Sequence, residues 1–350
     1  MPLHLLIRCL DAMRCVKLNV LHLHLTDAQS FPALFKAAQG EGQPNVTELG
    51  LKGAFQKLPS APRVATPASS AASSVNPEAG SGPEAGSAGL GRLPVYAYRE
   101  SDLLRLVREA KLRGIRVVPE VDVPAHSLSW AKAFPEAVVK CGHAESAAQS
   151  PEDIPALNPS KELVFDLITQ VLSRVAKIFP DPFLHLGADE VRLPCWEEDK
   201  ALMAWARERG LSARQLFNYF ETRVLDLAKP LNKTVVLWQG ALSSGANFKG
   251  REFTASSGGG GGGGGPPVAI QPWKCWSNLD GAAAALASES GLAVVDASCW
   301  YLDWPQPWTN YYDARFVNLP EPVASWPEAW PEAGWADQKV PRARRRVEAA

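Results

Sequence analysis

Six short apolar runs, separated by stretches with helical periodicity, constrain what this chain can fold into. The runs cover residues 18–25, 114–120, 183–187, 234–238, 267–271 and 292–298. Amphipathic patterns of crossover length cover 5–15, 100–113, 161–178, 213–228 and 280–290, with Ser101 as the expected N-cap of the second. Continuous apolar strands that alternate with helices indicate a parallel α/β sheet covered by helices. Both an open doubly wound sheet and a (β/α)8 barrel fit this order.

Composition limits the classes of protein to which the chain can belong. Its 350 residues, 46% of them hydrophobic, suffice for one large core or two modest ones. A formal charge of -1 provides no electrostatic field for nucleic acid. No apolar run is long enough to span a bilayer, and the amphipathic first residues do not read as a signal peptide. We therefore expect no nucleic-acid partner and no membrane span.

Two low-complexity segments interrupt the alternation of strands and helices. Residues 59–92 are rich in Pro, Ser, Ala and Gly, and residues 255–266 contain an unbroken run of glycines. Neither segment can bury enough apolar surface to offset the entropy lost on ordering. Because the alternation resumes after each, we interpret both as insertions within one domain over 1–316. A divergent and disordered tail is expected over 317–350.

Polar and aromatic residues gather just past the carboxyl ends of the predicted strands. Ligands bind at this edge both in barrels and in open α/β sheets. The pattern therefore predicts an active site without reference to any family. In chain order the residues are Asp27, Asp122 and His126, then Asp189 and Glu190, then Trp238, Gln239 and Trp273, and finally Trp300, Tyr301 and Asp303.

Adjacent Asp189 and Glu190 suggest carboxylate chemistry. Two like charges in a small volume should raise one pKa, and an apolar surround of Trp should raise it further, leaving a protonated acid near neutral pH. Asp27 and His126 would form a hydrogen-bonded relay to that acid. Taken alone, the acidic pair also fits a helix cap that favours the dipole. In combination with the relay and the Trp residues, it favours an active site.

Metal and nucleotide sites find less support in the sequence. His22 and His24 share one strand face, but no third ligand follows at a matching spacing. We interpret them, and His185, as hydrogen-bonded core histidines, and we expect no metal. The six cysteines form no CxxC pair, which argues against zinc. No phosphate-binding glycine motif follows the first strand, which argues against a nucleotide-binding protein.

Four segments, in the right order, resemble glycoside hydrolase family 20. Residues 19–32 (NVLHLHLTDAQSFP) resemble the family's NVLHWHxxDDQSFP, and residues 113–130 (RGIRVVPEVDVPAHSLSW) resemble RGIRVxPEFDxPGHxxSW. Residues 185–191 (HLGADEV) resemble the catalytic signature HxGGDEV, and residues 298–303 (SCWYLD) resemble the family's WYLD segment. The resemblance covers most of residues 5–312.

The resemblance implies an exo-acting retaining β-N-acetylhexosaminidase that needs no cofactor and acts on terminal β-linked GlcNAc or GalNAc of glycans or chitin oligomers. Glu190 would be the general acid/base, and Asp189 would orient the substrate's 2-acetamido group, whose carbonyl is the nucleophile. It further implies a Cys141–Cys195 disulfide, a lysosomal, vacuolar or secreted location and a homodimer in the full-length form. The other roles implied are Tyr301 bonded to the acetamido oxygen, Trp238 and Trp273 as pocket walls, Trp300 and Asp303 on the sugar, and Asp27 and His126 supporting Glu190.

The chain also departs from the family pattern. The family's first strand with its sugar-binding Arg, and its last strand with an LWGE-like segment, are not found. We therefore expect an incomplete (β/α)8 TIM-type barrel that lacks its first and last strands. An inactive truncated homologue or a glycan-binding relic is the alternative function. The point departures are Leu23 for Trp, Ala28 for Asp, Ala125 and Ala188 for Gly, and Gly240 for an acidic residue.

Overall fold

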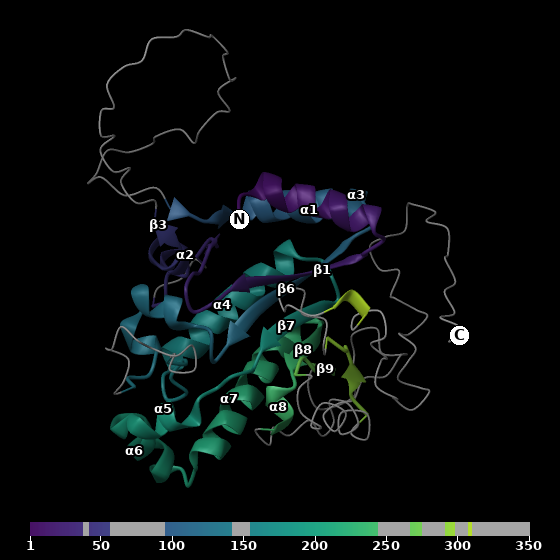
Figure 1. The fold of residues 1–350 in the computed structure, drawn as a ribbon. Helices are drawn as coiled ribbons and strands as arrows, with labels where there is room; N and C mark the ends of the chain where they lie inside the picture. The colour runs from purple at the N-terminus through teal and green to yellow at the C-terminus, as the bar shows by residue number, and fades with distance from the viewer. Residues whose placement is uncertain are drawn as a thin grey trace, which may run out of the picture.

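The computed structural model of the chain describes residues 1–37, 42–56, 95–141, 155–243, 267–274, 291–297 and 307–309. Within these residues, a six-stranded sheet runs in the order β1-β6-β7-β8-β9-β10 (Figure 1). Each neighbouring pair is parallel, so the predicted parallel sheet is confirmed. The strands are β1 (Val20–Thr26), β6 (Arg116–Val123), β7 (Phe183–Gly187), β8 (Thr234–Trp238), β9 (Val268–Gln271) and β10 (Ala293–Val294).

Several predicted features lie outside the described residues. These are the helix over 280–290, the insertion at 59–92, the insertion at 255–266, the tail over 317–350, and the site residues Trp300, Tyr301 and Asp303. Two small pairings flank the main sheet. They are β2 (Ala33–Leu34) with β5 (Tyr98–Arg99), and β3 (Phe55–Gln56) with β4 (Val95–Tyr96).

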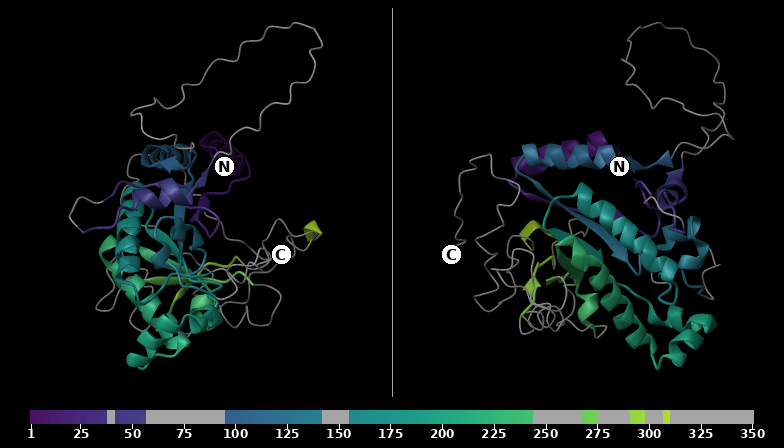
Figure 2. Two further views of the ribbon diagram at one scale, coloured as in Figure 1. Left: turned by 90° about the vertical axis from the view of Figure 1, so that its left-hand side faces the viewer. Right: turned by 180° about the vertical axis from the view of Figure 1, so that it is seen from behind.

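The helices that follow the strands pack beside one another along the sheet. Helix α1 contacts α3, α3 contacts α4, and α4 contacts α7, and Figure 2 shows α4 and α7 across the same side of the sheet. A strand order without reversal, covered by helices in chain order, is the arrangement of a barrel wall, because a doubly wound sheet reverses its order and takes helices on both faces. The helices are α1 (Leu3–Cys15), α2 (Thr47–Gly53), α3 (Glu100–Leu112), α4 (Glu162–Ile178), α5 (Leu193–Glu198), α6 (Lys200–Glu208), α7 (Ala213–Ala228) and α8 (Gly240–Ser243).

Local sequence explains where these helices begin. At α7, the Ser212 hydroxyl accepts from the Gln215 amide and the Gln215 side chain accepts from the Ser212 amide, which satisfies two donors of the first turn. The expectation that Ser101 caps α3 is wrong. The helix begins at Glu100, and the Asp102 carboxylate accepts from the Arg99 amide at 2.8 Å, so a residue inside the first turn supplies the bond.

The two faces of the sheet differ in what they pack against. The outer face joins the helices in the large hydrophobic core, to which α4 contributes a stripe at helical spacing, including Val164, Ile168, Val171 and Val175. The inner face carries a small apolar layer drawn from neighbouring strands, made of Val118, Phe183, Val236, Ala269 and Ala293. Layers contributed by successive strands are typical of a barrel interior.

A polar layer lies directly above this apolar one, toward the carboxyl edge of the sheet. Side chains two residues apart on a strand share a face. The residues that follow Val118, Phe183 and Val236 by two are Glu120, His185 and Trp238. Pairing of His24 with Glu120, and of Glu120 with His185, brings three strands into register at this level. The fold therefore places charged groups inside the sheet, just below the edge where a site is expected.

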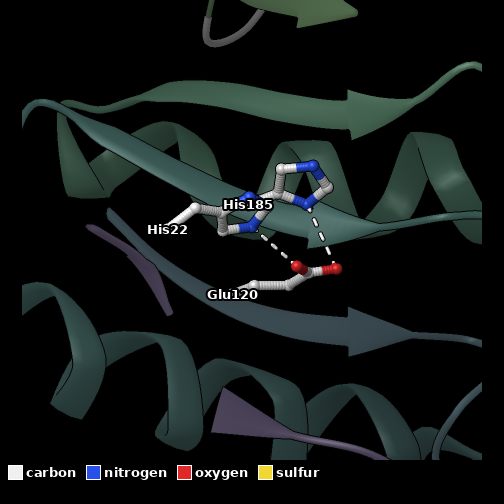
Figure 3. Close-up of side chains that lie close together, drawn as sticks. All are labelled: His22, Glu120 and His185. Carbon is white, nitrogen blue, oxygen red and sulfur yellow. Dashed lines mark ion pairs between the residues drawn. The ribbon is translucent and has the colours of Figure 1, made fainter. Parts of the chain in front are cut away.

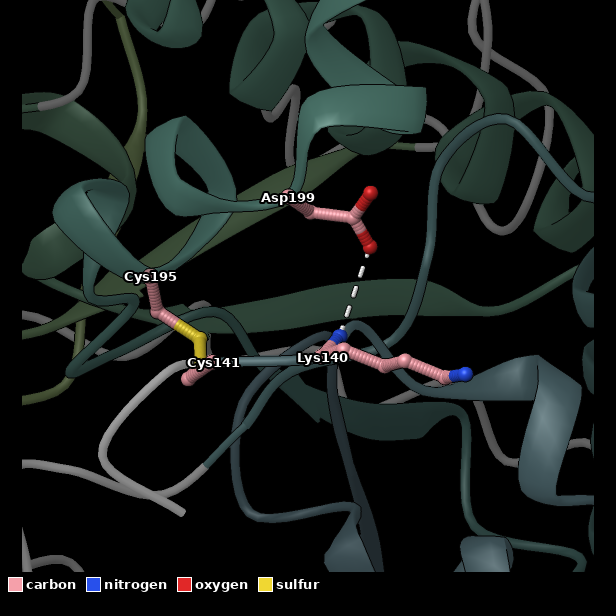
Figure 4. The surroundings of a disulfide bond; sticks show 4 residues. All are labelled: Lys140, Cys141, Cys195 and Asp199. Atoms are coloured by element: carbon pink, nitrogen blue, oxygen red, sulfur yellow. Dashed lines mark hydrogen bonds between the residues drawn. A yellow bond between two sulfur atoms is a disulfide. The ribbon is translucent and has the colours of Figure 1, made fainter.

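A disulfide joins the segment after β6 to helix α5. Cys141 and Cys195 are bonded with their Cα atoms 5.1 Å apart, as the resemblance implied (Figure 4). The same junction is held by Asp199, whose carboxylate accepts from the Lys140 amide at 3.3 Å and from the Leu202 amide at 2.9 Å. The covalent and hydrogen-bonded ties thus fix α5 and α6 against the loop that leaves β6.

Removal of this disulfide should destabilise the chain. Cys141 and Cys195 are 54 residues apart, and closing a loop of that length contributes about 4 kcal/mol in the chain-entropy model. We expect Cys141→Ser/Cys195→Ser to lose a large part of that free energy of unfolding, measured by urea denaturation under oxidising conditions. Cys15→Ser, at an exposed free thiol, is the matched control and should be neutral. Equal stability of the double variant and the control would contradict the structural role.

Candidate functional site

The described residues predicted for the site come together at the carboxyl edge of the sheet. Asp27 follows β1, His126 follows β6, and Asp189 and Glu190 follow β7. Trp238 ends β8, and Trp273 lies two residues past β9. The pairing register of the strands changes near the ends of β1 and β6. Such irregularities are typical of strands that redirect side chains beside a functional site.

Asp27, His126 and Glu190 form a linear relay. The Oδ1 atom of Asp27 lies 3.1 Å from Nδ1 of His126, and Nε2 of the same ring lies 3.2 Å from Oε2 of Glu190. Asp27 is itself held by the Ala28 amide, and its carbonyl accepts from the Ser129 hydroxyl at 2.7 Å. The side chain of Glu190 is 51% exposed, so one end of the relay opens to solvent.

The relay sets the charges of its members. Burial acts to lower the pKa of His126, but its hydrogen bonds to Asp27 and Glu190 and the charge of Asp189 raise it to about 10. The hydrogen bond from His126 outweighs burial and lowers the pKa of Glu190. The expected protonated acid at Glu190 is therefore wrong for this arrangement, because a cationic imidazole faces the carboxylate and half of the side chain is in water.

Asp189 holds the raised pKa instead. Burial is the largest cause and raises the pKa of Asp189 to about 6, while the charge of Glu190 is a smaller contribution. Carboxylate oxygens of Asp122 and Asp189 lie within 4.8 Å of each other. Asp122 is a fully buried residue of β6, and burial first, then the charge of Asp189, raise its pKa well above the usual value.

Backbone conformation separates the two adjacent carboxyl groups. Ala188 and Glu190 both adopt left-handed conformations, with φ of 69° and 52°, and so does His126 at 52°. Gly187 has φ 71°, and a Cβ there would lie 1.7 Å from Oδ1 of Asp122. Left-handed non-glycine residues cost free energy and gather at functional sites. Here they turn Asp189 inward and Glu190 outward.

A cavity of about 210 Å³ opens beside the carboxyl groups, lined by Asp189, Glu190, Trp238 and Trp273. Gln239 fixes its far wall, since its Oε1 accepts from the backbone amides of Trp273 at 2.8 Å and Lys274 at 3.0 Å. The ammonium of Lys274 lies 5.0 Å from the centroid of the Trp273 ring, and its charge contributes to the lowered pKa of Glu190. Two carboxyl groups beside flat indole walls suit a small neutral ligand with one apolar face.

Histidines and carboxylates gather below the cavity, and some of their atoms are already bonded to one another or to the backbone. One such group is His22, Glu120 and His185 (Figure 3). Glu120 accepts from Nε1 of Trp238 at 2.8 Å and its other oxygen lies 2.7 Å from Nε2 of His22. Nδ1 of His185 accepts from the Gly187 amide at 3.0 Å. Nε2 of His185 is buried without a hydrogen-bond partner, so the interpretation of the two rings as hydrogen-bonded core histidines holds only in part.

Sequence reasoning missed two residues that shape the site, Glu120 and Lys274. Strand periodicity offered a signal for Glu120, because it shares a face with Asp122 inside an apolar strand, where carboxyl groups need partners. Lys274 lies beyond the end of β9, and no sequence pattern indicates its contact with the Trp273 ring.

Comparison with known proteins places these residues in a family context. The family model described as "Glycosyl hydrolase family 20, catalytic domain" matches residues 1–344. Human beta-hexosaminidase subunit beta is 26% identical over 326 residues, which are 91% of this chain and 46% of that protein. Beta-hexosaminidase 1 of Arabidopsis thaliana is 27% identical over 320 residues, 91% of this chain and 45% of that protein. The chain thus spans about half the length of the curated relatives it matches.

Solved structures of the same family share the fold. A GH20 exo beta-N-acetylglucosaminidase from Vibrio harveyi, in complex with N-acetylglucosamine, has a TM-score of 0.57 and 21% identity, with coverage of 85% of this chain and 39% of that one. The Flavobacterium johnsoniae chitobiase has a TM-score of 0.61 and 19% identity, with coverage of 89% and 38%. At these identities the likeness establishes the fold alone.

The left-handed conformation at Ala188 predicts a stabilising substitution. Ala188→Gly removes the Cβ penalty of that conformation and should add about 0.5–1 kcal/mol to the free energy of unfolding after the entropy of the unfolded chain is counted. Ala125→Gly is the matched control, since Ala125 is equally buried but is not among the positive-φ residues. At position 125, glycine should lower the free energy of unfolding by a similar amount. Urea unfolding checks both, and the same sign at the two positions would refute the argument.

Proposed function

Because this chain belongs to glycosyl hydrolase family 20, we propose that it hydrolyses terminal β-linked N-acetylglucosamine or N-acetylgalactosamine from glycans or chitin oligomers. The observation that carries the proposal is that two adjacent carboxyl groups lie in different environments. Glu190 reaches solvent at the end of a relay, and Asp189 lies partly buried beside it with a raised pKa. Neighbouring carboxyl groups whose pKa values are pushed apart are characteristic of acid/base sites.

In the proposed mechanism, catalysis is assisted by the substrate. Glu190 donates a proton to the glycosidic oxygen, while the carbonyl oxygen of the sugar's own acetamido group attacks the anomeric carbon. Asp189 accepts the acetamido N–H, which orients the carbonyl and stabilises the positive charge that develops on the closed ring. Glu190 then takes a proton from water, and the water opens this ring with net retention. Trp238 and Trp273 would enclose the acetamido methyl, and Tyr301, Trp300 and Asp303 would complete the sugar contacts.

In the free site Glu190 lacks a proton, and substrate binding favours its protonated form. A sugar that covers the cavity removes water from Glu190, and desolvation favours the neutral carboxylic acid. The acetamido N–H at Asp189 favours the anionic form there, because a hydrogen bond to a charged acceptor lowers its pKa. Both effects move one proton from position 189 to position 190. Occupied and empty sites therefore differ in where a single proton resides.

The disulfide supports a location in an oxidising compartment, which for this family resemblance is the lysosome, the vacuole or the outside of the cell. Among the residues that the structure describes, none of the helices combines the length and the apolar character needed to cross a bilayer. Charge and composition give no support for a nucleic-acid partner.

Replacement of the acid tests the function directly. Glu190→Gln keeps the shape but cannot donate or accept the proton, so kcat for 4-nitrophenyl N-acetyl-β-D-glucosaminide should fall by about 10²–10⁴-fold. Glu197→Gln, at an exposed carboxylate on α5, is the control and should retain full activity. Saccharide binding without turnover in the unaltered chain would favour the glycan-binding alternative. Equal activity of Glu190→Gln and the control would exclude the assigned role.

Activity should also have an acidic optimum. The productive state carries one proton on the Glu190–Asp189 pair, so kcat/KM should rise as pH passes the lowered pKa of Glu190 and fall as pH passes about 6, where Asp189 ionises. His126→Gln removes the cation that lowers the pKa of Glu190, and the rising limb should then move to higher pH. A profile that stays flat to pH 8, or a rising limb unmoved by the substitution, would contradict this assignment.

A further inference from the structure

Glu120 is a wholly buried carboxylate that the proposed reaction does not use. It lies on β6 with 0% of its side chain exposed, and each oxygen has a different neighbour. Oε1 accepts from Nε1 of Trp238 at 2.8 Å, and Oε2 lies 2.7 Å from Nε2 of His22. One end of this carboxylate therefore contacts a wall of the cavity, and the other end is tied to β1.

Aromatic rings below the cavity complete the support of Trp238. The ring of His185 lies 4.6 Å from the Trp238 ring, centroid to centroid, and stacks at 4.7 Å on the ring of His22. Figure 3 shows both histidines directed toward Glu120 from neighbouring strands. The indole is thus held at its N–H edge by a hydrogen bond and on its buried side by a ring, so its plane has little freedom to tilt.

The charge of Glu120 strengthens this support. Burial acts to raise its pKa, but His185, His22 and His24 lower it below the usual range, so the group is a carboxylate. Burial lowers the pKa of His185 to about 3, and that ring is neutral at physiological pH. A hydrogen bond from an indole N–H to an ionised acceptor is stronger than one to a neutral acceptor. The hydrogen bond from the Trp238 indole to Glu120 is therefore of the stronger, charge-assisted type.

We propose that Glu120 is a positioning residue that fixes the plane of the Trp238 indole and thereby sets which acyl groups on the sugar nitrogen the cavity accepts. The inference rests on the proposed function, in which Trp238 encloses the acetamido methyl. A wall held by a hydrogen bond on one edge and by the tilted His185 ring behind keeps the cavity closed to longer acyl chains. Once the N–H edge is released, the indole can tilt and admit them.

The selectivity between N-acetyl and N-butanoyl aryl β-glucosaminides measures this role. It is the ratio of the two kcat/KM values, which does not depend on how much of the sample is folded. Glu120→Ala removes the acceptor and should lower the ratio by about tenfold, the order of discrimination that apolar pockets achieve for small changes in chain length. Glu120→Gln keeps a carbonyl acceptor for the indole and should retain most of the selectivity.

A double-mutant cycle tests whether Glu120 acts through Trp238. Trp238→Phe lacks the indole N–H and should itself relax selectivity, and Glu120→Ala should then add no further loss, because the two changes remove one interaction. Glu221→Gln is the matched control, since Glu221 is a buried carboxyl of α7 that does not line the cavity. It should leave the ratio unchanged. Unchanged selectivity in Glu120→Ala, or additive losses in the cycle, would overturn the proposal.

A measurement without turnover separates this proposal from the proposed function. In protein labelled with ¹⁵N-tryptophan, the indole N–H resonance of Trp238 is assigned by its loss in Trp238→Phe. It should shift in Glu120→Ala and stay in place in Glu221→Gln. If the unaltered chain hydrolyses neither substrate, the proposed function fails while this resonance still reports on the positioning bond. A Trp238 resonance that is indifferent to Glu120→Ala would refute the bond itself.

Discussion

Two buried carboxyl groups on the inner face of β6 govern the arrangement of the whole site. Glu120 and Asp122 point to the same side of the strand, where an uncompensated charge is very costly. The structure accommodates these two carboxyl groups in different ways. Glu120 remains ionised among histidines of β1 and β7 and the Trp238 indole, whereas the pKa of Asp122 is raised by burial and by the charge of Asp189. The side chains that β1, β7 and β8 present at this level of the sheet are therefore those that Glu120 and Asp122 require as neighbours.

The same constraint explains the glycine and the strained residues that follow β7. Gly187 has no Cβ because Asp122 occupies the space, and the chain then passes through left-handed conformations at Ala188 and Glu190. A backbone in that conformation is tolerated when surrounding contacts over-determine it. One of these contacts lies between His126 and Glu190 at 3.2 Å, and it anchors the residue at the end of the strained stretch. The family's glycine in place of Ala188 would remove part of the strain without changing these contacts.

Much of the fold was predictable from sequence because each strand is a continuous apolar run and each major helix carries its stripe at regular spacing. The edge on which the site lies followed from the same pattern, since Asp27, His126, Asp189 and Glu190 all come just after strands. The protonation states did not follow. His126 is 64 residues from Glu190 along the chain, and only the fold brings its cation to 3.2 Å from that carboxylate. Adjacency of Asp189 and Glu190 suggested repulsion, but burial proved to be the larger cause.

Adjacent carboxyl groups can take opposite roles only if the backbone sends them into different surroundings. Alternation along a strand would place neighbours on opposite faces of the sheet, and a helix would place them about 100° apart on one surface. The left-handed turn after β7 does neither, and it directs Asp189 into the polar layer and Glu190 to the cavity mouth. Asp189 is thereby partly buried beside Asp122, whereas Glu190 is held by the His126 cation. The division of labour within the pair is thus a property of the turn and of β6 beneath it.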